Sequence, residues 1–571
     1  MKNIKRDNSA LNPATDSRHP TVVLVSRWAV LALVAVTPLT IHLGMNDTFD
    51  LPKWSLMYMI TMVLAACWFA LAMSSDNVKI YSSAMDLPLI CLLAVMAVST
   101  LQSLDVNVSL LGYFRVYTFG LIPHLCMYLL YWLLIQFFMN AKMNGRGAHE
   151  FGQVLNAAAL SAGVAALYGI LQYFGVGIFR RMPSAEFSRV WSTMGNPLWL
   201  GGYLAMMGPV CLYLSSRTSS DANTVRAHRA ILALVVGGMI LTLSRSAWLG
   251  FLAAMSISLA AMAKVRSIAD GRTSVGNPLN TAMICCAALV LAVSVFAPAR
   301  ERFMSSFNPA EGTNLGRFEG WRVGVKVLKK RFWLGTGPDT FGIAFRKHKT
   351  MTYVRYQGQG KIQAHAHNDI VQYLVTAGIL GAGAYLWLWT ALAFTAFSAV
   401  KHFVMDADKS QDERLLIVTL SAALCAYFVQ NMFNFSAASS VMLFAVFTAM
   451  LVASAGQARE RSLENHLPKV IRMNAPGVFA AVMLLMAYHA VKPVMADLSF
   501  QKARSLSSVD TLGAFQHFET AVKLNPRNSF YIQEMGNFCR SQANIAETVE
   551  MRKTLIQKAV EYYQMNLIQH P

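Results

Sequence analysis

Long apolar runs divide the chain, and they constrain its fold more than any other feature. Each run holds roughly 17 to 25 mostly apolar residues, the length that an α-helix needs to cross the hydrocarbon core of a bilayer. The runs lack the alternating pattern of a barrel strand, so they predict helices. They lie at residues 23–41, 54–73, 86–104, 119–139, 154–175, 199–216, 228–244, 247–264, 279–298, 370–400, 415–434, 438–456 and 473–492. We therefore predict an all-α, polytopic integral membrane protein with about 12 or 13 transmembrane helices.

The composition excludes a soluble enzyme, because 55% of the residues are hydrophobic and only 14% are charged, whereas a soluble domain carries about 25% charged residues. The 49 Lys and Arg residues outnumber the 29 Asp and Glu residues, which gives a net charge of +20. In a soluble protein this charge would suggest binding to nucleic acid. Here the basic residues flank membrane spans, and we expect no nucleic acid partner. The sequence has no Cys-x-x-Cys or Cys/His zinc spacing, so it predicts no disulfide framework.

The distribution of Lys and Arg predicts the orientation in the membrane. Residues 1–22 are polar, and no small-residue cleavage signal closes the first run, so we expect a cytoplasmic N-terminal segment followed by an uncleaved anchor. With this orientation every loop on the inner side is basic, as the positive-inside rule requires. The basic residues of these loops are Lys79, Lys142, Arg146, Arg217, Arg226, Arg229, Lys264, Arg266, Arg272, Lys401, Lys409, Arg414, Arg459, Arg461, Lys469 and Arg472.

This topology divides the chain into two sets of spans, 23–298 and 370–492, separated by a long outer loop at 299–369. The loop carries seven Arg and six Lys against five Asp or Glu. Long loops escape the orientation rule, so the loop is either simply solvated or a surface for an anionic substrate. The run 370–400 is expected to be one tilted helix. The stretch 228–264 is expected to be a tight hairpin, because only Ser-Arg-Ser interrupts it.

The tail, residues 493–571, is expected on the same outer side as the loop. Its pattern predicts amphipathic helices at 497–506, 510–524, 528–541 and 545–568. The stretch "FETAVKLNPRNSFYIQEMGN" resembles the junction of one tetratricopeptide (TPR) hairpin. Fewer than three such repeats rarely stand alone, so we expect the TPR-like tail to pack on the loop or to bind a protein partner.

A polar cluster marks the point where the outer loop enters the run 370–400. It consists of His365, His367, Asn368 and Asp369, and polar side chains at this depth must face protein or water. The cluster could be a reactive site. It could also be an ordinary helix start with Asn368 or Asp369 as N-cap. A metal site is a further alternative, because His-x-His followed by Asp supplies several ligand types.

Several arginines fall on the same outer face as His367 under this topology. One of them, Arg245, lies in a short turn close to hydrocarbon, where a cation without an anion is costly. Another, Arg115, fits a simple interfacial anchor. The guanidinium fork makes bidentate bonds to phosphate oxygens, so we expect a lipid-linked diphosphate or an anionic headgroup as the ligand. The arginines are Arg115, Arg189, Arg245, Arg317 and Arg322.

At these residues the chain resembles the O-antigen ligase and polymerase superfamily, membrane glycosyltransferases that use polyprenyl-diphosphate-linked glycans. The most specific match is His367-Asn368, nine residues, then Gly378 and Gly381, which is similar to a pattern of the ligases. Further landmarks follow the order of the family: the Arg189 segment with "GNP", the Ser-Arg turn at 244–245, and Arg317 through Trp321. The resemblance covers about residues 25–460 and excludes the tail.

The resemblance implies a mechanism. Arg245, Arg189 and Arg317 would hold the diphosphate of an undecaprenyl-diphosphate glycan, with Arg322 and Arg115 as further donor-binding candidates. Neutralisation by these residues would replace a metal ion, so no cofactor is expected. His367 would position or deprotonate an acceptor hydroxyl, and in-line displacement would invert the anomeric carbon. His365, Asn368 and Asp369 would support the imidazole. The implied location is a bacterial inner membrane, with the site facing the periplasm.

The acceptor stays open at this stage. A ligase of lipopolysaccharide biosynthesis transfers the glycan to a sugar of the lipid A core, a polymerase extends another lipid-linked repeat unit, and a protein O-oligosaccharyltransferase modifies Ser or Thr. The spacing after His367 favours a ligase, whereas the tail favours a polymer or protein partner. Outside the enzymes, a lipid-linked glycan transporter would place its ionisable groups near the midplane and show internal repeats. A membrane-anchored scaffold would leave the aligned arginines unexplained.

Overall fold

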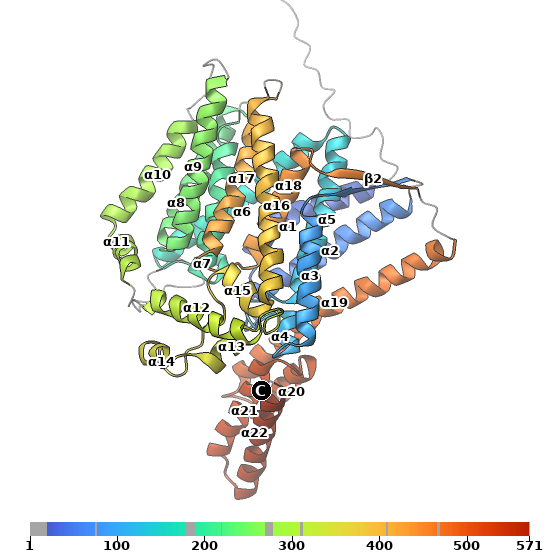
Figure 1. Ribbon diagram of the computed structural model, residues 1–571. Coiled ribbons are helices and arrows are strands. Elements are labelled where there is room, and N and C mark those ends of the chain that lie inside the picture. The colour runs from blue at the N-terminus through green and yellow to red at the C-terminus, as the bar shows by residue number, and fades with distance from the viewer. Residues whose placement is uncertain are drawn as a thin grey trace, which may run out of the picture.

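The computed structural model describes residues 20–74, 77–177, 189–217, 220–268, 278–308, 312–406, 409–464 and 469–569, and residues 1–19 of the predicted N-terminal segment lie outside this range. Every predicted apolar run is mostly helical, and the helices form a bundle (Figure 1). The helices of the runs are α1 (Pro20–Val36), α2 (Asp50–Met73), α3 (Asp86–Leu101), α5 (Leu121–Met143), α6 (Gly147–Tyr173), α7 (Pro197–Leu214), α8 (Ala222–Leu241), α9 (Arg245–Ile268), α10 (Pro278–Val295), α15 (Asp369–Thr376), α16 (Gly378–Met405), α17 (Gln411–Asn431), α18 (Ala438–Ser454) and α19 (Lys469–Leu506).

The prediction of an all-α polytopic membrane protein is confirmed. Nine of the described helices are long and apolar enough to cross a membrane, or up to ten if the bent pair α10–α11 counts as one span. This number is lower than the count of apolar runs, partly because α3 and α18 have only 16 and 17 residues. At 1.5 Å per residue such helices are shorter than a bilayer core of about 30 Å. The centre of the bundle is α7, with 89% of its span buried.

One end of the bundle carries a small element that the sequence did not predict. Strands β1 (Asn77–Ser82) and β2 (Arg459–Glu464) pair antiparallel across two loops that were both predicted to lie inside. The ion pair between Lys79 and Glu460, 2.8 Å long, joins the two strands. We call this the ribbon end. The pairing shows that these two predicted inner loops lie at the same end of the bundle.

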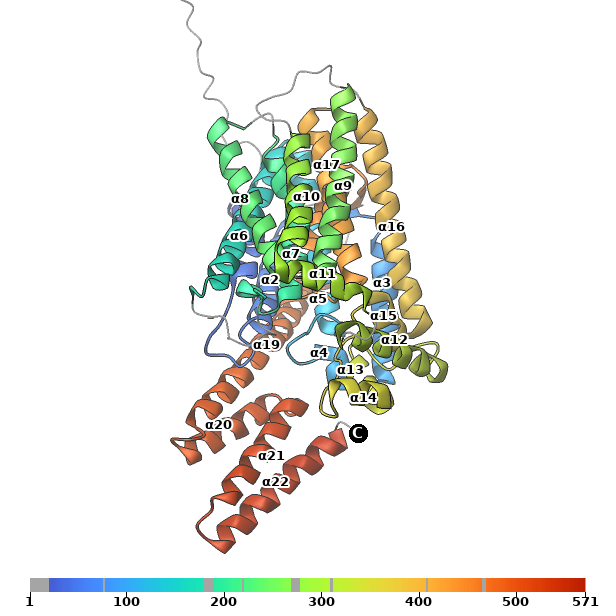
Figure 2. The same ribbon diagram turned by 90° about the vertical axis from the view of Figure 1, so that its left-hand side faces the viewer.

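The opposite end, which we call the loop end, carries the long loop and the tail (Figures 1 and 2). The helices of the loop region are α11 (Ala297–Met304), α12 (Gly312–Lys330), α13 (Phe341–His348) and α14 (Met351–Gln357). The tail forms α20 (Thr511–Leu524), α21 (Ser529–Asn544) and α22 (Val549–Gln569), while α4 (Val106–Leu111) follows the third apolar run. The loop and the tail therefore share one end of the molecule.

The expected single helix at 370–400 is wrong. The run is broken into α15 and α16 at Gly378, which has a left-handed φ of +68°. A Cβ at this position would overlap the backbone carbonyl of Trp333, so the close approach of the long loop requires glycine. By contrast, the hairpin predicted at 228–264 is confirmed, because α8 and α9 are joined by a short turn at 242–244.

The predicted separate helix at 497–506 is also wrong, because these residues are the end of the 38-residue helix α19. This helix packs chiefly on α2 and α20, and only 6% of its apolar span is buried. Its last turns hold the tail through Asp497, whose carboxylate accepts hydrogen bonds from the Asp47 N–H and the Tyr531 hydroxyl, each 2.8 Å long. The tail thus packs against the segment at Asp47, whereas the sequence led us to expect packing on the loop 299–369 or binding to a protein partner.

Candidate functional site

Four arginines from four different segments meet at the loop end. Arg189 follows the residues at 178–188 that the structure leaves undescribed, and its Nε donates to the carbonyl of Thr242 at 2.8 Å. This bond ties the Arg189 segment to the turn between α8 and α9. Arg245 is the first residue of α9, while Arg302 lies in α11 and Arg317 in α12. The fold therefore brings residues more than a hundred positions apart in sequence into one cationic group.

Neutral oxygen atoms fix the guanidinium of Arg245. Its Nη1 donates to the hydroxyls of Ser305 and Ser306 at 3.2 and 3.1 Å, and its Nη2 donates to the side-chain carbonyl of Asn314 at 3.1 Å. Asn314 is itself held by the carbonyl of Asn308 at 2.9 Å. These contacts hold α12 and the residues directly after α11 against the start of α9.

Arg189 shows how closely the cations approach one another. Burial, together with the charges of Arg302, Arg245 and Arg317, lowers the pKa of its guanidinium to about 9. Like charges at short range are unfavourable unless an anion lies between them. Arg302 was not singled out from the sequence, although it lies in "ARERF" directly after an apolar run, the position in which Arg245 attracted attention.

His367 lies beside this cationic group. The Trp321 Nε1 donates to the carbonyl of Ala366 at 3.1 Å, which anchors α12 next to the histidine. Burial lowers the pKa of His367 to about 3, the charges of Arg317 and His365 act in the same direction, and the side chain of Asn434 opposes them. The imidazole is therefore neutral at physiological pH, which leaves one ring nitrogen able to accept a proton, while the neighbouring cations weaken it as a base.

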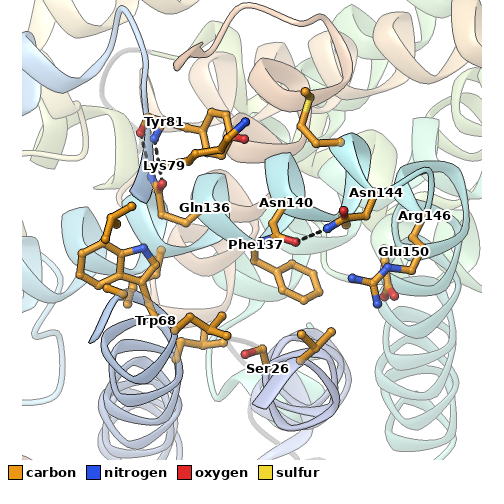
Figure 3. A pocket seen from close by; sticks show the side chains of 18 residues that line it. Ser26, Trp68, Lys79, Tyr81, Gln136, Phe137, Asn140, Asn144, Arg146 and Glu150 are labelled. Atoms are coloured by element: carbon orange, nitrogen blue, oxygen red, sulfur yellow. Dashed lines mark hydrogen bonds between the residues drawn. The ribbon is translucent and has the colours of Figure 1, made fainter. Parts of the chain in front are cut away.

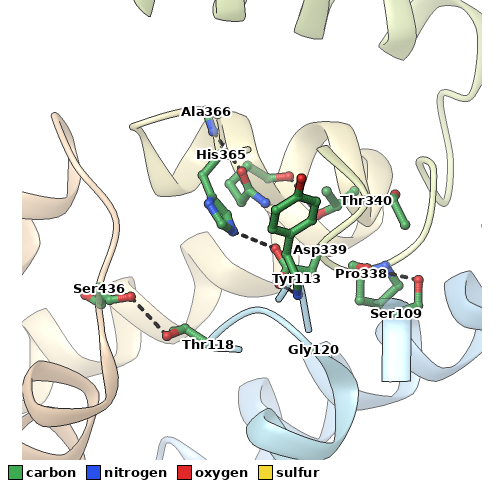
Figure 4. Close-up of polar contacts among 12 residues, drawn as sticks. Ser109, Tyr113, Thr118, Gly120, Pro338, Asp339, Thr340, His365, Ala366 and Ser436 are labelled. Carbon is green, nitrogen blue, oxygen red and sulfur yellow. Dashed lines mark hydrogen bonds and ion pairs between the residues drawn. The ribbon is translucent and has the colours of Figure 1, made fainter. Parts of the chain in front are cut away.

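Behind His367, a second histidine forms a buried pair that the sequence did not reveal. The Nε2 of His365 lies 2.9 Å from Oδ1 of Asp339 (Figure 4). The same carboxylate accepts the backbone N–H of Tyr113. Burial raises the pKa of Asp339, and contact with His365 and the N–H of Tyr113 opposes this rise. The pair thus connects two parts of the long loop, and the N–H of Tyr113 connects them to the segment after α4.

The two polar residues after His367 point to other partners. Asn368 is the N-cap of α15, because its side chain accepts the N–H of Val371 at 2.9 Å. The N-cap alternative is thus confirmed for this residue. The buried carboxyl group of Asp369 accepts the hydroxyl of Tyr385 at 3.0 Å. Burial raises the pKa of Asp369 to about 7. Of the three proposed supporting residues, His365 and Asp369 are hydrogen-bonded to residues other than His367.

The metal alternative finds no ligand cluster in the described part of the chain. There, no three His, Cys, Asp or Glu side chains gather in a way that could hold a metal ion. The candidate ligands have different partners, because His365 binds Asp339 while Asp369 binds Tyr385.

Two of the predicted donor-binding arginines lie apart from the other three. Arg322 forms an ion pair with Glu319 at 3.1 Å, and 63% of its side chain is exposed. Arg115 donates to the side-chain carbonyl of Asn46 at 3.1 Å and lies 5.7 Å from the ring centre of Phe530 in the tail. The structure therefore brings Arg189, Arg245 and Arg317 together with Arg302, and places Arg115 against the tail.

Backbone strain is concentrated around this site. Among the described residues, five that are not glycine have a left-handed φ, between 49° and 70°. Such conformations cost about 1–3 kcal/mol each and gather at functional sites. Two of the five, Asp339 and His367, belong to the site, and Leu243 lies two residues before Arg245. The five are Arg115, Ser192, Leu243, Asp339 and His367.

Two cavities, one at each end of the bundle, differ in their surroundings. A cavity of about 440 Å³ lies at the ribbon end, where Lys79, Gln136, Arg146 and Glu150 line it (Figure 3). Its lining includes none of the candidate site residues predicted from the sequence. A cleft of about 550 Å³ lies at the loop end and includes Arg115. The candidate chemistry is thus confined to the loop end.

Comparison with known families gives one match, to the family described as O-antigen ligase, over residues 230–386. The matched region contains Arg245, Arg302, Arg317, Asp339 and His367, whereas the segments with Arg115 and Arg189 and the whole tail lie outside it. A search of curated proteins finds no match to the chain.

Proposed function

We propose that the protein is a membrane glycosyltransferase that transfers a glycan from undecaprenyl diphosphate to an acceptor hydroxyl, a proposal supported by the match of residues 230–386 to the family described as O-antigen ligase. The reaction takes place at the periplasmic face of a bacterial inner membrane. One observation carries the proposal: Arg189, Arg245, Arg302 and Arg317 converge beside the neutral imidazole of His367.

The arginine group binds the diphosphate of the donor. An Arg side chain presents a planar fork of donors that matches phosphate oxygens, and a charge-assisted bond of this kind is stronger than a neutral one. The mutual repulsion that lowers the pKa of Arg189 is relieved when an anion binds between the cations. In the transition state the diphosphate gains negative charge, so the same residues stabilise the leaving group.

The transfer itself is a displacement at the anomeric carbon. The acceptor oxygen forms a bond to this carbon while the bond from the carbon to the diphosphate oxygen breaks. The electron pair of the broken bond leaves with the diphosphate, and the proton of the acceptor hydroxyl passes to His367. Attack in line with the leaving group inverts the configuration. The diphosphate lies near Arg317 and so offsets one of the charges that lower the pKa of His367, which strengthens the base when the donor is present.

The acceptor in this proposal is a sugar of the lipid A core, as in a ligase. Repeat-unit polymerisation and protein O-glycosylation use the same donor chemistry and differ only in the hydroxyl that enters the site. The spacing from His367 to Gly378 and Gly381 favours the ligase. A domain of this family is compatible with either ligase or polymerase activity.

The decisive experiment is transfer by purified protein in liposomes that contain an undecaprenyl-diphosphate glycan. Lipid A core, a second lipid-linked repeat unit and a Ser-containing peptide are offered separately, each with and without EDTA. We expect product on lipid A core that persists in EDTA. The variant His367→Asn should lose at least about 100-fold in rate, because Asn tolerates a left-handed φ but cannot act as the base. Arg355→Gln, an exposed change on α14, is the control and should stay active.

The other outcomes assign other functions. Product only on the lipid-linked unit identifies a polymerase, and product only on the peptide identifies a protein O-oligosaccharyltransferase. Dependence on a divalent metal contradicts the proposed mechanism. Tight donor binding that requires Arg245, together with inactivity on every acceptor, favours the lipid-linked glycan transporter.

A further inference from the structure

The cleft that includes Arg115 lies at the loop end, on the side of the tail. It has a volume of about 550 Å³ and is lined by α2, α19, the residues around α4, α13 and the tail. In Figure 2 the tail helices α20, α21 and α22 follow the lower end of α19 and lie below α4. The arginine group beside His367 contributes no residue to this lining.

The mouth of the cleft is cationic. Four of its described lining side chains are Arg or Lys: Arg115, Arg346, Lys347 and Arg527. Asp105 is the one carboxylate among these lining residues, and it is engaged as N-cap of α4 by the N–H of Val108. Arg346 and Lys347 lie in the last turn of α13 and are exposed. A mouth of this charge fits a ligand that carries phosphate groups.

The floor of the cleft is apolar and belongs to membrane-spanning helices. It is formed by Leu51, Trp54 and Tyr58 of α2 and by Pro493 of α19, and both helices are candidate spans. Because only 6% of the apolar span of α19 is buried, the protein leaves this helix open to the lipid. An acyl chain can therefore lie along α2 and α19 while its headgroup stays at the mouth.

The tail forms the outer wall of the cleft and is held there by specific contacts. The ring of Phe530 stacks on Phe114 with centroids 4.8 Å apart. The side-chain amide of Asn107 donates to the carbonyl of Arg527 at 3.0 Å. The guanidinium of Arg115 lies 5.7 Å from the centre of each of the two Phe rings. These contacts bring a cation of the tail and a cation of the bundle to the same mouth.

One thin wall separates the cleft from the candidate reaction site. Tyr113 lines the cleft, while its N–H donates to Asp339 and its ring meets His365 edge-on at 6.0 Å. The charge of Arg346 also reaches the Tyr113 hydroxyl. A headgroup in the cleft thus lies next to the segment that carries His367.

We propose that this cleft binds a phosphorylated glycolipid, with its phosphates at Arg115, Arg346 and Lys347 and an acyl chain along α2 and α19. The inference rests on the proposed function in one respect: in that reaction, the glycolipid is the acceptor. The cleft then holds the acceptor by its lipid part, while the arginine group beside His367 holds the donor.

The test compares lipid retention in two double variants of the full chain in phosphatidylcholine nanodiscs. Bisphosphorylated lipid A is the probe and dephosphorylated lipid A the reference. In Arg346→Gln/Lys347→Gln we expect retention of the probe to fall about tenfold or more. Lys326→Gln/Lys329→Gln removes the same charge from exposed positions on α12 and should retain the probe as the wild type does. The reference lipid should bind weakly to all three proteins.

A second readout locates the lipid. A photo-crosslinking residue at Tyr58 in the cleft should capture the acyl chains of lipid A and lose this capture in Arg346→Gln/Lys347→Gln. The same residue at Met59, which is 44% exposed on the outside of α2, should capture lipid equally in all variants. Equal retention in the two double variants, or retention without crosslinking at Tyr58, overturns the proposal. Binding of the undecaprenyl-diphosphate glycan is measured on the same samples, so a failure of donor binding counts against the proposed function and leaves the cleft result intact.

Discussion

The Nε2 of His365 lies 2.9 Å from Oδ1 of Asp339, and the two side chains are only 1% and 0% exposed. A buried pair of this kind holds its segments in one geometry, because either partner alone would be left with an unsatisfied polar group. Here the pair fixes the segment that leads to His367, and the N–H of Tyr113 donates a further hydrogen bond to Asp339. Asp339 is therefore a positioning residue for the imidazole in the proposed reaction.

The first prediction concerns Asp339→Asn. Asn tolerates the left-handed φ of 56° at this position, so the backbone is unaffected, but the carboxylate that binds His365 is lost. We expect the free energy of unfolding to fall by about 1–3 kcal/mol and kcat to fall more than the KM for the donor rises. Thermal unfolding and steady-state kinetics measure the two effects. Asp510→Asn, at an exposed N-cap where Asn works as well as Asp, is the control. An unchanged kcat in Asp339→Asn would contradict the positioning role.

The second prediction concerns Arg302, which was not identified from the sequence and which the fold places at the site. Replacing it with Gln removes one cation from the group around Arg189 and should raise the KM for the lipid-linked donor about tenfold or more, the effect of one charge-assisted bond. Arg300→Gln removes the same charge two residues earlier, from an exposed position of the same helix. Equal donor KM values in the two variants would remove Arg302 from the binding site.

The third prediction concerns the pH dependence of the reaction. The pKa of His367 is lowered to about 3, so the imidazole stays neutral as the pH falls through its ordinary value near 6.5. If His367 is the base, kcat/KM should stay flat from pH 8 down to about pH 5. Arg317 is one of the charges that lower this pKa, so Arg317→Gln should move the acid limb to higher pH. A wild-type acid limb near pH 6.5 would argue against the buried, neutral base.

How much of this site could be predicted from the sequence depends on how far apart in the sequence the interacting residues lie. His367 and Arg245 were found because a polar residue at a membrane edge is conspicuous within a short window. Asp339 lies 26 residues from His365 in an unremarkable turn, so only the fold could pair them. Membrane topology assigns residues to a face but gives no lateral position, and this is why Arg115, which the fold places against the tail, was grouped with the other arginines.

The same distinction applies to the fold. Apolar runs predicted the helices because hydrophobic length is a local property of the chain. The break before α16 was missed because the apolar run continues through Gly378, and the need for glycine arises only from the approach of Trp333. The ribbon of β1 and β2 was missed because it joins two loops almost 400 residues apart, neither of which has a strand pattern of its own.

The fourth prediction tests the break. Gly378→Ala would force a Cβ into the carbonyl group of Trp333 at a left-handed φ of +68°, so the long loop must move away from α15. We expect a lower midpoint of thermal unfolding and the loss of transfer activity. Gly383→Ala, one turn further along α16, adds a Cβ where no atom lies within 4 Å and should be tolerated. Equal stability of both variants would show that the break does not depend on glycine.

The fifth prediction tests which end of the bundle faces the periplasm. The native Cys539 is unsuitable for thiol labelling, because it is buried in the tail with 0% exposure. Met351 on α14 is 81% exposed at the loop end, and Met143 is 59% exposed at the end of α5 that approaches the ribbon end. In intact cells whose outer membrane has been permeabilised, a membrane-impermeant maleimide should label Met351→Cys and should reach Met143→Cys only after the inner membrane is opened. The reverse pattern would place the arginine group in the cytoplasm and exclude a periplasmic transferase, because the proposed donor and acceptor meet on the outer side.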